Sequence, residues 1–179
     1  EKMYLTVKEH DLAIEMYKRN RQFDQMIRLV GLYRKDLLGE THIHLARQLE
    51  SDGNYREAER RYLEGKDWKG AVQMYKSADM WEDGVRVAKQ NGGANASKRV
   101  AYEWGLHLGG DAGASLLRKF NLLEEAIDYA CESGEFDNAF ELAKAGAGNK
   151  VRDVHQKRAM FLEDEGRFEE AEAEFIQAE

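Results

Sequence analysis

Proline is absent from the 179 residues, cysteine occurs once, and no apolar run approaches the length of a membrane-spanning helix. Because proline breaks helices and is common in loops, its absence favours many helices joined by very short turns. The single thiol, Cys131, has no partner for an intrachain disulfide, which is typical of a reducing compartment such as the cytosol. We expect no transmembrane segment and no signal peptide.

An excess of basic residues is also missing. The net charge is −7, and residues 121–179 alone contain 6 basic and 16 acidic residues. A nucleic-acid-binding protein usually carries a basic face, so we expect no nucleic-acid partner. The acidic last third is either a solvated helix surface or a docking site for a basic partner. The candidate docking residues are Glu163, Asp164, Glu165, Glu169, Glu170, Glu172 and Glu174.

The sequence does contain a repeated pattern. A large apolar anchor is followed three positions on by a small residue and seven positions on by an apolar or small residue. These spacings place all three on one helical face, where the small residue lets a neighbouring helix come close. The core residues that this pattern predicts are Phe23, Tyr55, Ala58, Tyr62, Trp68, Ala71, Tyr75, Trp81, Leu123, Ala126, Phe136, Ala139, Phe168, Ala171 and Phe175.

We therefore predict an all-α fold, a right-handed α-solenoid of tetratricopeptide-like helical hairpins with about twelve helices. Capping boxes are expected at Asn54 with Glu57, Asp79 with Glu82 and Asn121 with Glu124. Some glycines fall inside the predicted helices, where each costs about 0.5–1 kcal/mol relative to alanine. They are Gly31, Gly70, Gly84, Gly105 and Gly113, of which only Gly84 lies at a small-residue position of the repeat.

Motifs for catalysis or metal binding are not found. His42 and His44 are two positions apart and point away from each other on a helix, and no His-Glu-x-x-His pattern is present. The glycine-rich residues 108–117 lack the Gly-Lys-Ser/Thr ending of a phosphate loop. We therefore expect no enzyme, no metal and no cofactor.

Longer strings in three places carry a more specific signal. They are REAERRYLEGKDWKGAVQMYKSADMWEDGVRVAKQNGGANASKRVAYEWGLHLGG (56–110), LLEEAIDYACESGEFDNAFELAK (122–144) and AMFLEDEGRFEEAEAEFIQA (159–178). Together they resemble the helical-repeat region of the intraflagellar transport protein 172 family, whose members are peripheral subunits of intraflagellar transport complex B. The resemblance covers nearly the whole chain.

This resemblance implies that residues 1–179 form a single helical-repeat segment, a fragment of a longer chain whose β-propellers precede the repeats. It implies a non-catalytic scaffold without a cofactor that supports the assembly and maintenance of cilia and flagella by train-based cargo transport. The implied partners are other intraflagellar transport subunits and ciliary cargo. The implied location is the cilium or flagellum, including its base, and the cytoplasm.

Three alternatives remain open at the level of sequence. A tetratricopeptide-type groove for cargo peptides would show an inward-facing set of Asn, Lys and Arg, and no regular set is evident. A vesicle-coat arm has the same periodicity, although the family-specific strings argue against it. An enzyme would require a cavity with convergent polar groups.

Overall fold

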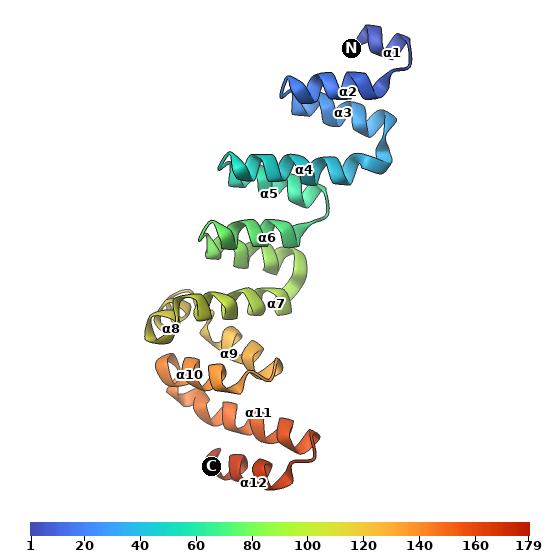
Figure 1. Ribbon diagram of the computed structural model, residues 1–179. Helices are drawn as coiled ribbons and strands as arrows, with labels where there is room; N and C mark the ends of the chain where they lie inside the picture. Colours follow the sequence, from blue (N-terminus) through green and yellow to red (C-terminus); the bar gives the residue numbers. More distant parts are fainter. The chain divides into compact units, whose positions relative to one another are not determined.

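The computed structural model describes all 179 residues and contains only helices and turns (Figure 1). The predicted all-α, helical-repeat fold with about twelve helices is therefore confirmed. The chain divides into two compact units, Glu1–Asp79 and Met80–Glu179, which are described in turn as unit 1 and unit 2. None of the helices combines the length and the apolar character that crossing a membrane requires.

Unit 1 consists of helical hairpins. Helices α2 (His10–Arg19) and α3 (Phe23–Tyr33) pack together, as do α4 (Leu38–Ser51) and α5 (Tyr55–Glu64). The short helix α1 (Lys2–Thr6) lies on α2, and α6 (Trp68–Ser77) lies on α5. A 3₁₀ turn, η1 (Lys35–Leu37), leads from the first hairpin into α4.

Unit 2 also consists of packed helices, one of which is much longer than the rest. Helix α7 (Trp81–Leu108) is interrupted at Gly93 (φ 79°, ψ −169°). It packs on α8 (Gly110–Lys119) and α9 (Leu123–Glu132), and α10 (Phe136–Gly146) packs on both of these. The 3₁₀ turn η2 (Gly148–Lys150) precedes the last hairpin, α11 (Val151–Asp164) and α12 (Phe168–Gln177).

The predicted anchors mark where helices begin. Seven helices (α3, α5, α6, α7, α9, α10 and α12) start at Phe23, Tyr55, Trp68, Trp81, Leu123, Phe136 and Phe168. The small residue three positions on is the most buried part of each repeat, since Ala58, Ala71, Ala126 and Ala139 are all 0% exposed and Ala171 is 3% exposed. Tyr62 and Tyr75, seven positions after their anchors, are also buried.

Two anchors in α12 depart from the expectation. Phe168 is 67% exposed and Phe175 is 38% exposed, although the repeat pattern predicts both in the core. The physical reason is that α12 packs on α11 alone, so only the face that carries Ala171 meets another helix. Periodicity identifies the face of a helix but not the number of neighbours that cover it.

Most turns between helices share one geometry, and it corrects the predicted capping boxes. At Gly53 the amide donates to Glu50 and the next amide, of Asn54, donates to Leu49, which is a Schellman motif. Asp79 and Asn121 occupy the equivalent left-handed position, with φ of 58° each, so neither caps a helix. The N-caps of α7 and α9 are Met80 and Leu122, and Asn54 caps α5 without a side-chain hydrogen bond.

Two of the helical glycines meet at the contact between α7 and α8. A Cβ atom on Gly113 would lie 2.5 Å from the carbonyl oxygen of Gly105, and one on Gly105 would lie 2.7 Å from Cδ1 of Leu117. The absence of both side chains lets the two backbones approach closely. This explains two glycines that the repeat pattern leaves without a reason.

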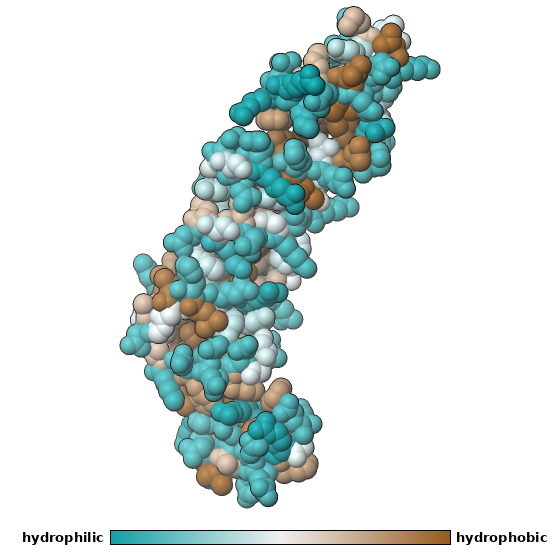
Figure 2. Space-filling view, in the orientation of Figure 1, coloured by the Kyte–Doolittle hydropathy of each residue, from teal (hydrophilic) through white to brown (hydrophobic).

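Apolar surface is unevenly distributed. In unit 1, Figure 2 shows hydrophobic surface over the region of α1 to α4. The exposed large apolar residues of this region are Met3, Val7, Leu12, Leu32, Tyr33 and Leu37. Apolar side chains gathered over one region of a helical-repeat protein are a feature of interaction sites.

Candidate interaction surface

The seven acidic residues predicted as a docking site come from one hairpin. Glu163 and Asp164 end α11, and Glu165 is the C-cap that follows. Glu169, Glu170, Glu172 and Glu174 lie on α12, so the α11–α12 turn brings the set together. Acidic residues in the first turn of a helix are also favoured by its dipole, which accounts for Glu169 and Glu170 without any partner.

Three of these carboxylates are already paired within the chain. Glu174 is only 18% exposed, and its oxygens lie 2.7 Å from Nδ1 of His155 and 3.5 Å from Nε of Arg158. The Arg167 guanidinium donates to Glu170 and holds the pKa of that carboxyl below its ordinary value. Arg167 also lies 3.5 Å from Glu165.

The acidic surface that remains is therefore smaller than the sequence implies. Glu163, Asp164, Glu169 and Glu172 are exposed and form no ion pair within the chain. Phe168, which is 67% exposed, stands beside them at the start of α12. A mixed surface of unpaired carboxylates and an aromatic ring suits a protein partner that carries both basic and apolar side chains.

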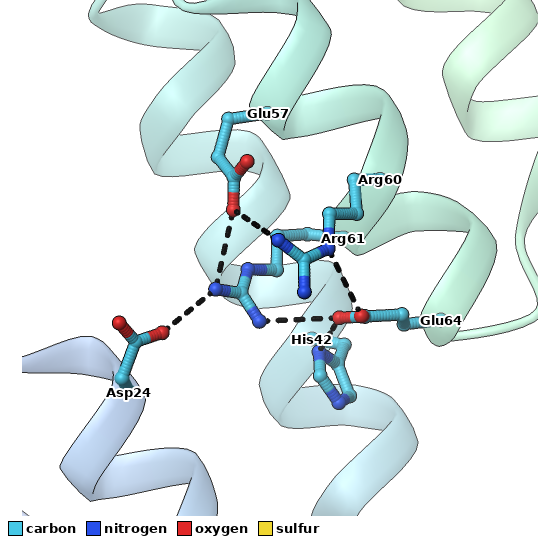
Figure 3. A network of polar contacts seen from close by, with 6 residues as sticks. All are labelled: Asp24, His42, Glu57, Arg60, Arg61 and Glu64. Carbon is cyan, nitrogen blue, oxygen red and sulfur yellow. Dashed lines mark hydrogen bonds and ion pairs between the residues drawn. The ribbon is translucent and has the colours of Figure 1, made fainter.

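Unit 1 contains a charged cluster that sequence reasoning missed (Figure 3). Arg61 of α5 is only 8% exposed, and its guanidinium lies 3.0 Å from Asp24 of α3, 3.2 Å from Glu57 and 3.1 Å from Glu64. The Nε atom of Arg61 is buried without an acceptor. This cluster ties the α2–α3 hairpin to the α4–α5 hairpin through a single side chain.

His42 of α4 extends the cluster. Its Nδ1 atom lies 3.1 Å from a carboxylate oxygen of Glu64 but lacks hydrogen-bond geometry toward it. Burial lowers the pKa of His42 below its ordinary value of 6.5, although the Glu64 carboxylate acts in the opposite direction. The helical spacing of Glu57, Arg61 and Glu64 was visible in the sequence, but the partners from α3 and α4 were not.

The side chains that could carry metal or nucleophile chemistry can be located in the structure. No group of three or more His, Cys, Asp or Glu residues is placed to hold a metal ion. Cys131 is buried, and burial raises the pKa of its thiol, which disfavours the reactive thiolate. Burial and a 2.7 Å hydrogen bond to Glu50 raise the pKa of Tyr62 to about 12, which keeps its phenol protonated.

These features define the class of protein. The helical hairpins repeat one turn geometry and one close contact at a small residue, which is typical of helical-repeat proteins. The surfaces of such proteins commonly bind other proteins.

Comparison with known proteins identifies the family. No protein-family model matches the chain. Over 99% of its length it is 61% identical to the intraflagellar transport protein 172 of Chlamydomonas reinhardtii and 58% identical to the homologue of Danio rerio. It is also 41% identical, again over 99% of its length, to the intraflagellar transport protein osm-1 of Caenorhabditis elegans. The chain belongs to the intraflagellar transport protein 172 family and spans about 10% of the length of these relatives.

Proposed function

We propose that the chain is a non-catalytic scaffold segment of an intraflagellar transport complex B subunit, which supports the assembly and maintenance of cilia or flagella by train-based cargo transport. Its partners are other subunits of the complex and ciliary cargo. Its location is the cilium or flagellum, including the base, and the cytoplasm. Residues 1–179 act as a single helical-repeat segment of a longer subunit.

The observation that carries this proposal is the 53–61% identity to vertebrate and algal intraflagellar transport proteins across the entire helical segment. Identity at this level extends beyond the core, because only 36 apolar residues, 3 polar residues and Gly84, Gly105 and Gly113 are buried. A surface of helical hairpins offers length and many separate contact sites, which is the physical requirement of a scaffold.

A chimera tests the proposal. The chain replaces the matching segment of the Chlamydomonas reinhardtii protein in cells that lack their own copy. We expect flagella to assemble, and we expect the same chimera with Ala71→Arg to fail, because the arginine is forced into a site that is 0% exposed. An intact chimera that accumulates at normal levels but builds no flagella contradicts the proposal.

A pull-down separates a binding segment from a spacer. The chain is used to capture proteins from a lysate of ciliated cells, with the Ala71→Arg variant as the unfolded control. Recovery of intraflagellar transport subunits by the folded chain alone supports direct contacts within these 179 residues. Equal recovery by both proteins would show that the contacts do not depend on the fold.

A further inference from the structure

Unit 1 contains a groove whose walls are α2 and α4 and whose floor is α3. Its main cavity has a volume of about 600 Å³, within the range of about 300–1,000 Å³ that is usual for ligand sites. Met26 and Val30 form the floor and are 5% and 3% exposed, while Ile14 and Ile43 line the walls. A smaller cavity of about 190 Å³ shares Lys18, Met26 and His44 with the first and extends the groove toward the end of α2.

Basic residues gather at this end of the α2–α4 groove. Lys18, Arg21 and Arg47 line the two cavities and are exposed. None of the three forms an ion pair within the chain, in contrast to Arg61 and Arg167. Unpaired cations beside a buried apolar floor are a complement to carboxylates carried on an apolar segment.

We propose that the α2–α4 groove binds an acidic amphipathic helix of a partner protein, whose apolar side chains enter the groove and whose carboxylates meet Lys18, Arg21 and Arg47. This inference rests on the proposed function as an interaction segment and adds a binding site and the chemistry of its partner. It also places the alternative of a peptide-binding groove at a definite site. The sequence does not reveal this site, because its cations come from two hairpins and have no regular spacing.

The structure favours a helix over an extended peptide. The walls and the floor are helices, so their backbone amides and carbonyls are already hydrogen-bonded and cannot pair with an added strand. A helical ligand satisfies its own backbone groups and presents apolar side chains at positions i, i+3, i+4 and i+7. Residues 37–48 border the groove, and at 1.5 Å per residue this length corresponds to roughly three turns of a bound helix.

The structure disfavours a nucleic acid as the ligand. Glu15 and Glu40 also line the groove, where they would repel a phosphate backbone. The apolar floor offers side-chain contacts rather than a continuous basic track, which nucleic-acid sites require. A protein helix can place its carboxylates against Lys18, Arg21 and Arg47 and keep them away from Glu15 and Glu40.

Fluorescence anisotropy with designed peptides tests this proposal on the 179-residue chain. The probe is a labelled fourteen-residue helix with leucines on one face and glutamates confined to one end, and its control has lysines in place of the glutamates. We expect the acidic peptide to bind, and we expect the variant with both Lys18→Glu and Arg47→Glu to bind it roughly tenfold more weakly. Arg56→Glu is the matched control, because Arg56 is exposed, unpaired and outside the groove, and each such reversal changes the net charge equally.

Four results would overturn the assignment, and the first three concern the peptide. The first is that the acidic peptide binds no better than the basic one. The second is that Arg56→Glu weakens binding as much per reversed charge as the double variant does. The third is that an oligonucleotide of equal charge displaces the peptide. Self-association of the chain that disappears in the double variant would make a second copy the occupant and would also overturn it. The Chlamydomonas reinhardtii chimera keeps the two proposals apart, because an intact chimera that builds flagella while no peptide binds leaves the proposed function standing without the groove.

Discussion

Replacing Gly113 by alanine should destabilise the protein, although alanine is the better helix former. The new Cβ atom would lie 2.5 Å from the carbonyl oxygen of Gly105, whereas carbon contacts are optimal at roughly 3.5–4.0 Å. The obstacle is backbone, so α8 must move about 1 Å away from α7. Overpacking of this kind costs about 1–3 kcal/mol, and the helix propensity of alanine returns about 1 kcal/mol. We expect the free energy of unfolding to fall by up to about 2 kcal/mol.

Gly31→Ala provides the matched control. Gly31 also lies inside a helix, α3, but no atom stands within 4 Å of the position of its added Cβ. Only the higher helix propensity of alanine acts there, so we expect the free energy of unfolding to rise by about 0.5–1 kcal/mol. Urea denaturation followed by far-ultraviolet circular dichroism measures both variants. If Gly113→Ala stabilises the protein as much as Gly31→Ala does, the inference that the backbones of α7 and α8 are in close contact at Gly113 is wrong.

The same assay checks three further predictions. Lys66 has a φ of 60° in its turn, so Lys66→Gly should stabilise the protein by about 1 kcal/mol, and Gly53→Ala, at a φ of 76°, should destabilise it by a similar amount. Arg61→Met should cost about 1–2 kcal/mol, below the roughly 3–5 kcal/mol of a fully buried pair, because Asp24 is 89% exposed and can be rehydrated. Burial lowers the pKa of His42 below 6.5, so the unfolded chain binds the proton more readily than the folded protein. The stability that depends on neutral His42 is therefore fully present above pH 6.5 and is lost as the pH falls below that value, and His42→Gln should lack this part of the pH dependence.

The sequence predicts the local units of this fold well. Anchor residues such as Tyr55 and Leu123 begin their helices because the 3-4-7 spacing reports which face of a helix is apolar. Zero exposure at Ala58 and Ala126 follows from the same pattern, since only a small side chain permits close helix contact. These properties depend on residues within one turn of each other, which a single sequence displays directly.

The turns show where local pattern reasoning fails. Asn121 with Glu124 matches a capping box in letters, but the left-handed backbone of Asn121 makes it the end of one helix rather than the start of the next. Aspartate and asparagine are favoured in both roles, so composition alone does not separate them. The following helix therefore starts one residue later than the capping box predicts, because the residue after the left-handed position is its N-cap.

The charged sites depend on neighbours that are distant in sequence. The Arg61 cluster needs Asp24 from α3, and the α2–α4 groove needs Lys18 and Arg47 to lie on facing walls. Whether a charge is paired depends on how hairpins stack, and the repeat pattern does not report that stacking. Counting acidic residues in the last third therefore predicted a larger docking surface than the unpaired carboxylates provide.

Pairing and net charge have separable effects on the acidic surface. An internal ion pair leaves the net charge of the last third unchanged, so the attraction of a basic partner over a distance remains. Contacts at short range instead require carboxylates that are free to form new pairs, such as Glu169 and Glu172. We therefore expect Glu169→Lys with Glu172→Lys to weaken the binding of a lysine-rich peptide more than Glu165→Lys with Glu170→Lys, although both change the net charge equally. Equal weakening, with the fold of both variants verified by circular dichroism, would mean that only the net charge acts and that the unpaired carboxylates form no docking site.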